Sequence, residues 1–211
     1  MIVREDSRGQ AFTLEGLASA LILLGALLFA VQSVVVTPTS SGGVDASTQT
    51  DLRQQADDIL LTTARAETND LSTLVRNWSQ SSRTFSGAVQ RNIGYGPETP
   101  PGAFGVMLNQ TFTQRSYFYN IEVVYRPRNL STGTRRIPFV YRGEPSETAV
   151  SASYTVTLYD NQTLTARNAS QNVELWQYDT NATNGVNGYY PIPNAVNGPV
   201  YNVVEVRVVV W

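Results

Sequence analysis

The sequence predicts an α+β protein: an N-terminal transmembrane helix, a linker, one or two amphipathic helices and then a mostly antiparallel β-sheet. Three patterns along its 211 residues lead to this fold class. An apolar run occupies residues 17–36. Through residues 51–78, apolar side chains recur at intervals of three and four, as on one face of a helix. From Tyr117 the interval becomes two, as in a strand.

The apolar run of residues 17–36 is interrupted by only three polar residues. As a helix it is about 30 Å long, which matches the hydrocarbon core of a bilayer. Arg4 and Arg8 precede the run and the next basic residue is Arg53, so the positive-inside rule predicts a cytoplasmic N-terminus and an external domain. A buried helix of a soluble domain and a secretory signal peptide are the alternatives, but a signal peptide has a shorter apolar core.

The informative residue is Glu15, a carboxylate at the front of the apolar segment. Carrying an unpaired carboxylate into a bilayer costs free energy, and a simple anchor gains nothing from it. Residues 8–16, Arg-Gly-Gln-Ala-Phe-Thr-Leu-Glu-Gly, resemble the start of type IV pilins. The Arg-Gly-Gln junction resembles that of haloarchaeal pilin-like proteins and archaellins in particular, which carry a prepilin-type (class III) signal sequence.

This resemblance implies that a prepilin peptidase cleaves between Gly9 and Gln10, which makes Gln10 the mature N-terminus. Cleavage after Gln10 is the alternative, because it restores the position that the glutamate has in bacterial pilins. The resemblance also implies that Glu15 pairs with the freed amine of a neighbouring subunit during assembly. An α-amine ordinarily has a pKa of about 7.7 to 8 and is largely cationic at neutral pH, so the two charges satisfy each other in lipid.

The function implied by the resemblance is structural: a subunit or minor component of an archaeal type IV pilus-like assembly that serves adhesion or surface attachment. The implied partners are membrane lipid, a prepilin peptidase and other pilin-like subunits. The expected organisation is a leader at residues 1–9, a transmembrane and assembly helix at 10–36, a linker at 37–50 and an extracellular domain at 51–211.

The linker is predicted from Pro38 and the Ser-Ser-Gly-Gly segment that follows it, since these residues end a helix and cannot hold regular structure. In typical pilins the N-terminal helix often continues into the globular domain. A helix broken at Pro38 therefore also fits a second hypothesis, a single-pass membrane-anchored extracellular binding protein that does not polymerise.

The composition excludes most enzymatic chemistry, because the chain has no Cys, no His and no Lys. The missing Cys removes disulfides and thiolate metal sites, and the missing His removes the commonest general base. Schiff-base chemistry and P-loops need the missing Lys. We therefore expect no enzyme, no cofactor and no metal; a hydrolase built from carboxylates alone is the remaining alternative. The net charge of −2 indicates no nucleic-acid partner.

Within the domain, Asp51 is expected to cap a helix over residues 51–78. A second, shorter helix is expected after the Gly- and Pro-rich residues 94–102, with an apolar face made of Phe104, Met107, Leu108 and Phe112. Further strands are expected at residues 137–141, 149–159, 164–167, 173–178 and 201–210, with a tight turn at Asp160 and Asn161. The last strand is apolar enough to lie in the centre of the sheet. The alternative is that this strand lies at an exposed edge.

The loops carry six Asn-x-Ser/Thr sites for N-glycosylation: Asn77, Asn109, Asn129, Asn161, Asn168 and Asn181. Glycans at such sites would add bulk and hydration to a surface protein. Residues 179–198 form a loop rich in Asn and Gly. Its start resembles a calcium loop, but the twelfth position is Tyr190 rather than Glu, which favours a turn-rich loop.

Two further features of the domain allow alternative interpretations. Tyr189 and Tyr190, followed by prolines, fit either an exposed contact surface or core packing. The densest positive region of the chain consists of Arg126, Arg128, Arg135, Arg136 and Arg142. It fits a solvated face of a strand better than a contact with acidic glycans or lipid headgroups.

Overall fold

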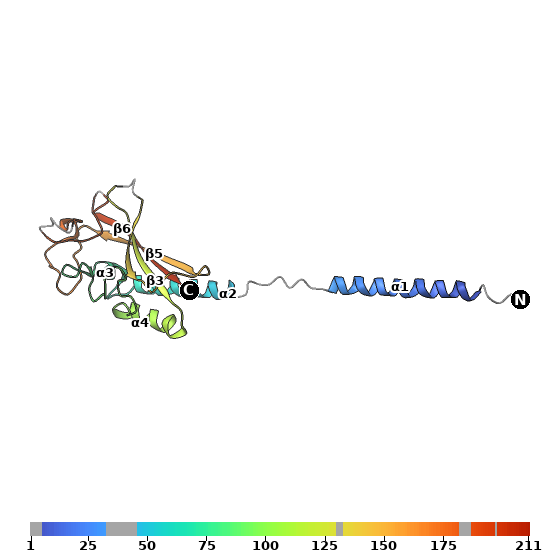
Figure 1. The fold of residues 1–211 in the computed structure, drawn as a ribbon. Coiled ribbons are helices and arrows are strands. Elements are labelled where there is room, and N and C mark those ends of the chain that lie inside the picture. The colour runs from blue at the N-terminus through green and yellow to red at the C-terminus, as the bar shows by residue number, and fades with distance from the viewer. Residues whose placement is uncertain (1–5, 33–45, 130–132, 182–186, 197) are drawn as a thin grey trace. The chain divides into compact units, whose positions relative to one another are not determined.

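The computed structural model describes residues 6–32, 46–129, 133–181, 187–196 and 198–211. The chain divides into two compact units, Met1–Gly43 and Val44–Trp211. The first contains a single described helix, α1 (Asp6–Gln32), and all other elements belong to the second (Figure 1). These elements are α2 (Ala46–Ala64), α3 (Leu71–Val75), β1 (Trp78–Ser79), β2 (Thr84–Phe85), α4 (Gly102–Thr111), η1 (Thr113–Arg115), β3 (Tyr119–Tyr125), β4 (Arg135–Val140), β5 (Val150–Tyr159), η3 (Leu175–Gln177) and β6 (Val200–Val210).

The main sheet has four strands in the order β4-β3-β6-β5, and every neighbouring pair is antiparallel. The α+β fold with a mostly antiparallel sheet is therefore confirmed. β6 pairs with β3 on one side and with β5 on the other, so the prediction that the last strand is central is confirmed as well (Figure 1). Its valines at alternate positions from Val204 to Val210 are buried, whereas Glu205 and Arg207 between them lie on the outer face.

The core lies between the inner face of this sheet and the helices, and aromatic rings join its parts. The ring of Phe139 on β4 lies 4.6 Å from that of Phe85 on β2, between centroids, and 5.1 Å from that of Tyr95. Phe104 on α4 approaches it at 6.3 Å. Edge-to-face aromatic pairs of this kind add about 0.5 to 1.5 kcal/mol each beyond the burial of their area. Phe139 thereby connects the small β1–β2 hairpin, α4 and the main sheet.

The helix predicted over residues 51–78 differs from the structure in three ways. α2 begins five residues earlier, at Ala46, so residues 46–50 of the predicted linker are helical and Asp51 does not cap the helix. Four of these five residues are polar, and an apolar period cannot reveal such a first turn. The helix also ends at Ala64, because Asn69 adopts a left-handed conformation and Asp70 caps a new helix, α3, by accepting a hydrogen bond from the Thr73 N–H. After α3 the chain enters β1 at Trp78.

The second predicted helix is confirmed as α4, with Phe104 and Leu108 buried and Phe112 buried just after its end. Gly105, near the start of α4, lies close to the backbone of Pro100 in the turn before the helix. A Cβ atom there would lie 1.8 Å from the Pro100 carbonyl oxygen, so only glycine permits this approach.

Two predicted strands are wrong. Leu164 and Ala166 are buried, but residues 164–167 form no strand, and Thr163 pairs with Glu174 only in an isolated bridge. Residues 173–178 instead contain the 3₁₀ turn η3, where Glu174 and Gln177 form a reciprocal capping box. Both segments bury apolar side chains from loops, and short apolar runs cannot distinguish that arrangement from a strand. The turn at Asp160 and Asn161 is present, although it leads to the bridge rather than to another strand.

Buried tyrosine hydroxyls make the stability of this domain sensitive to alkaline pH. Burial raises the pKa of Tyr95 to about 12, and it raises the pKa values of Tyr190 and Tyr201 as well. Above pH 10 these groups lose protons in the unfolded chain but keep them in the folded one, so the free energy of unfolding falls as pH rises.

We expect a loss of about 1 kcal/mol for each such tyrosine between pH 10 and 11, measured by chemical denaturation of the full chain in detergent. Tyr95→Phe removes one titrating group. The fall of the free energy of unfolding with pH should therefore become smaller by the contribution of one tyrosine. The variant is also less stable at pH 8, because the Tyr95 hydroxyl donates to the Ser86 carbonyl at 2.8 Å. An unchanged alkaline slope in the variant would contradict this account.

Candidate functional site

The exposed apolar surface of the helix α1 is the most unusual feature of the protein. Its segment Phe12–Phe29 has a mean hydropathy of 2.0 and is long and apolar enough to cross a membrane. Every side chain in this segment is exposed within the chain. Phe12 is 72% exposed and Phe29 78%, so the apolar surface runs the whole length of the segment. A helix that is apolar all round requires an apolar environment, which the described residues of this chain do not provide.

The residues predicted for processing and assembly all lie in α1. Gly9 and Gln10 are in its first turns, and Glu15 follows inside the apolar segment. The segment of membrane-spanning hydropathy, Phe12–Phe29, lies within the helix predicted for residues 10–36 and begins five residues before the apolar run of residues 17–36. Glu15 consequently lies within the apolar length rather than in front of it. The predicted end of the helix near residue 36 and most of the predicted linker fall outside the described residues.

The six predicted glycosylation sites differ in exposure. Asn129, Asn161, Asn168 and Asn181 are exposed and lie outside helices and strands. Asn109 is half-buried within α4, and Asn77 is half-buried beside Trp78, which is only 2% exposed. The first four are therefore accessible to a glycosylating enzyme, and the last two are much less so.

The loop of residues 179–198 packs against the domain through its tyrosines. Tyr190 is 1% exposed and its hydroxyl donates to the Val75 carbonyl, while Tyr189 packs against Trp78. Core packing is thus the correct interpretation for Tyr190. The Asp179 carboxylate accepts a hydrogen bond from the Asn181 N–H at 2.8 Å, an ordinary turn contact. Among the residues described, no three His, Cys, Asp or Glu side chains come together as a metal site.

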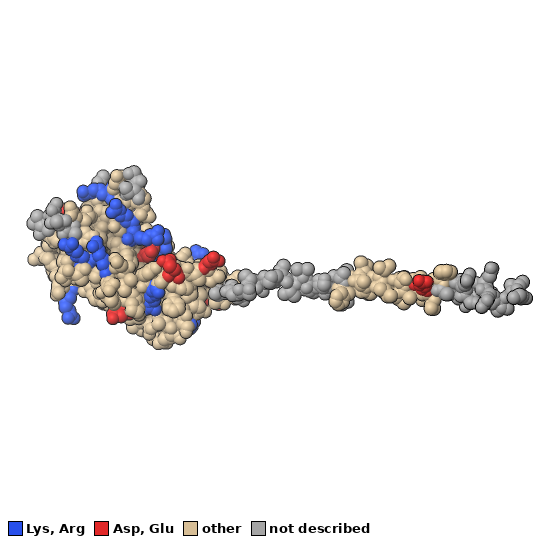
Figure 2. Space-filling model, in the orientation of Figure 1, with Lys and Arg blue, Asp and Glu red and all other residues tan. Residues whose placement is uncertain are grey.

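The structure separates the five arginines of the positive region. On the face of the domain seen in Figure 2, basic side chains lie in a band that meets acidic side chains at one end. Arg136 is a solvated residue of this kind, 3.4 Å from the Glu122 carboxylate. Arg128 and Arg135 instead line one hollow of about 420 Å³ together with Tyr125 and Tyr189.

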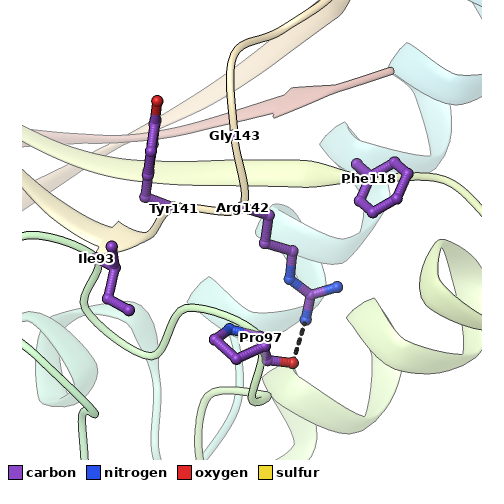
Figure 3. A pocket seen from close by; sticks show the side chains of 6 residues that line it. All are labelled: Ile93, Pro97, Phe118, Tyr141, Arg142 and Gly143. Atoms are coloured by element: carbon purple, nitrogen blue, oxygen red, sulfur yellow. Dashed lines mark hydrogen bonds between the residues drawn. The ribbon is translucent and has the colours of Figure 1, made fainter.

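Arg142 has a different role, as the centre of a polar network below an apolar hollow. This hollow, of about 490 Å³, is lined by Ile93, Pro97, Phe118, Tyr141, Arg142 and Gly143. Figure 3 shows the Arg142 side chain extending toward Pro97, whereas the Tyr141 ring points away from it. Its guanidinium donates to the Gly96 carbonyl (3.2 Å), the Thr113 hydroxyl (3.1 Å), the Tyr119 hydroxyl (2.9 Å) and the carbonyls of Pro97 and Glu98 (3.4 and 3.3 Å). These bonds join the Gly- and Pro-rich turn, η1 and β3.

Sequence reasoning missed two residues that the structure makes prominent. The sequence places Arg142 in the positive region with four other arginines. No local signal reveals that its hydrogen-bond partners lie 23 to 46 residues away in the chain. Trp176 lay within a predicted strand, where an aromatic side chain is expected to be half-buried. It is 54% exposed in η3, with its indole N–H donating to the Glu174 carboxylate at 2.6 Å.

The fold and its features define a class: an α+β domain preceded by an apolar helix of membrane length that carries one internal carboxylate. The chain belongs to a family of unknown function, DUF7288, which matches residues 8–210. The match includes α1 and Glu15 as well as the whole main sheet. No curated protein and no solved structure shows significant similarity to it.

The Arg142 network predicts a large effect of one substitution on stability. Arg142→Ala removes five hydrogen bonds, two of them partly buried ones to the Gly96 carbonyl and the Tyr119 hydroxyl, so we expect a loss of about 2 to 4 kcal/mol in the free energy of unfolding. Arg142→Lys should recover only part of it, since an ammonium cannot reproduce the planar fork. Arg136→Ala, which removes one exposed ion pair, is the matched control and should cost less than about 1 kcal/mol. Equal losses for Arg142→Ala and Arg136→Ala in thermal melts would contradict the assigned role.

Proposed function

We propose that this protein is a pilin-like cell-surface protein, a subunit or minor component of a type IV pilus-like assembly, anchored through α1 with its domain outside the cell. The observation that supports this most is the uncovered apolar length of α1 with Glu15 inside it. Burial of each Leu, Ile or Phe side chain in lipid or against other helices contributes about 1.5 to 3 kcal/mol. Insertion of this helix is therefore strongly favourable even with a carboxylate in it.

The geometry of an α-helix indicates that the Glu15 carboxylate can pair only with the amine of a second chain. In a mature chain beginning at Gln10, the new amine lies five residues from Glu15, about 7.5 Å along the axis and about 140° around it. The two groups of one helix therefore point away from each other. A neighbouring helix shifted along its axis can instead bring its amine to this carboxylate. Pairing between chains removes the cost of both charges in an apolar environment, which links cleavage to assembly.

The extent of the family match agrees with this proposal. It covers residues 8–210, so it contains the proposed cleavage site and α1 from Arg8 onward. The Gly9–Gln10 bond lies in the first turns of the helix, where unpaired N–H groups make local opening inexpensive. A peptidase can therefore reach this bond without unfolding the rest of α1.

The second hypothesis is a membrane-anchored binding protein that never polymerises. It is favoured by the division of the chain into two compact units, because α1 then needs no fixed relation to the domain. The two proposals differ in what Glu15 does. A monomeric anchor leaves this residue without a role, whereas an assembling helix requires it.

N-terminal sequencing of the native protein, followed by comparison of Glu15 variants, tests the proposal. We expect the mature chain to begin at Gln10. Glu15→Gln should leave cleavage and membrane insertion unchanged but abolish recovery of multimers from sheared cell surfaces, because the neutral amide cannot neutralise an amine. Glu67→Gln, an exposed acid of the domain, is the matched control and should assemble normally.

A retained Met1 would exclude processing and leave the plain anchor. Normal multimers with Glu15→Gln would show that the carboxylate is not used in assembly. Loss of the protein from the membrane in that variant would instead mean that Glu15 acts in insertion, which also contradicts the proposal.

We also propose N-glycosylation of the exposed sites Asn129, Asn161, Asn168 and Asn181. Intact mass of the native protein should exceed that of the polypeptide, and glycopeptides should carry these four residues far more often than Asn77 or Asn109. The physical reason is access, since a glycosylating enzyme must surround the asparagine side chain. A native mass equal to that of the bare chain would exclude the modification.

A further inference from the structure

We propose that the loops beside Trp176 form a binding cleft for an acidic oligosaccharide, such as a polyuronate. Two adjoining hollows, of about 300 and 420 Å³, share Arg128, Thr180 and Pro193 as a common wall. We call the two together the saccharide cleft. It lies wholly within the unit Val44–Trp211, so the inference does not depend on what α1 assembles with.

Trp176 forms one end of the saccharide cleft. It lines the smaller hollow and is 54% exposed, although an indole of this size is normally buried. Its N–H donates to the Glu174 carboxylate at 2.6 Å, and the Glu174–Gln177 capping box holds the turn that carries it. An exposed ring held in one orientation is a preorganised platform, because little side-chain entropy remains to be lost on binding. Flat apolar rings of this kind stack against the C–H face of a pyranose.

The other end of the cleft is positively charged. Arg128 and Arg135 line the larger hollow, and no carboxylate is among the described residues that line it. In the part of the chain that the structure describes, the ion pairs are Arg136–Glu122 and Arg207–Glu205, so neither Arg128 nor Arg135 is in one. Guanidinium groups bind carboxylates through two parallel hydrogen bonds. These two arginines can therefore receive the acidic group of a ligand.

The smaller hollow adds the acceptors that sugar hydroxyls need. Asp179, Thr180 and Asn194 line it beside Trp176. Hydroxyl groups both donate and accept, so a sugar is satisfied by carboxylate and amide oxygens together with arginine donors. A simple polyanion such as polyphosphate has no donor for Asp179 and is repelled by it. The arrangement thus favours a saccharide whose neutral face stacks on Trp176 and whose acid lies toward Arg135.

Buried hydrogen bonds hold the walls of the cleft in place. Asn202 on β6 is 0% exposed, and its amide donates to the Pro193 carbonyl at 2.7 Å and to the Arg126 carbonyl at 3.0 Å. It thereby connects Pro193, which lines the cleft, and Arg126, two residues before Arg128, to the central strand. The Asn194 amide donates to Asp160 at 2.8 Å, which orients its oxygen. The cleft is therefore built on the rigid sheet, as a specific site must be.

Calorimetry with tetragalacturonate tests the inference on the full chain in nanodiscs of neutral lipid. We expect binding that weakens with ionic strength, and at least about tenfold weaker binding for Trp176→Ala and for Arg135→Gln. Matched controls are Phe118→Ala, an exposed aromatic residue elsewhere, and Arg136→Gln, which carries its charge outside the cleft; both should change affinity less than about twofold.

Two further probes define the ligand class. Neutral maltotetraose should bind far more weakly than tetragalacturonate, and polyphosphate binding should be insensitive to Trp176→Ala. Absence of tetragalacturonate binding to the chain made without glycans, or equal losses in the Trp176 and Phe118 variants, would overturn the proposal. Polyphosphate binding as tight as that of tetragalacturonate and equally dependent on Trp176 would overturn the assignment to a saccharide.

The saccharide has two possible sources, because Asn129 and Asn181 lie beside the cleft as glycosylation sites. The double substitution Asn129→Gln and Asn181→Gln separates them in protein from native cells. Tetragalacturonate binding that is equal in both forms supports an external polysaccharide. Binding only in the double variant supports a glycan of the chain itself as the occupant, and no binding in either form contradicts both.

Discussion

The constraint on which the whole molecule depends is that the apolar surface of α1 has no cover within the described chain. A soluble domain hides its apolar helices in its own core, but the segment Phe12–Phe29 is exposed along its length. The segment is long and apolar enough to cross a membrane, and its exposed apolar surface fits lipid or contact with other helices. In the assembly that we propose, an opposite charge from a neighbouring chain offsets the cost of placing the Glu15 carboxylate in such a surface.

The domain of Val44–Trp211 buries an apolar core of its own. Its main sheet buries one face against α2, α3 and α4 and presents charged and hydroxyl side chains on the other. The β4 edge is protected by Pro138 within the strand and by residues 93–95, which bond to it through the Tyr95 N–H and the Ile93 carbonyl. The sheet thus carries the loops that line the proposed saccharide cleft beside Trp176.

Residues that act through neighbours in the chain were predictable, and residues that act through distant ones were not. Glu15 stands alone in an apolar run, and the alternation of valines in β6 reveals a central strand. Arg142 and Trp176 carry no such local signal: the partners of Arg142 come from three separate segments, and Trp176 is exposed only because a capping box replaces the predicted strand. Both segments wrongly predicted as strands bury their apolar residues from loops.

The sequence alone determined the apolar segment with Glu15 at its front, the absence of Cys, His and Lys, and the α+β class. Each of these depends on composition or on the period of a local pattern. Only the tertiary structure decided which arginine lies in a network and which line a hollow, that Tyr190 is buried, and that Asn202 joins two walls of one cleft. These depend on contacts between segments up to 115 residues apart, which no local pattern encodes.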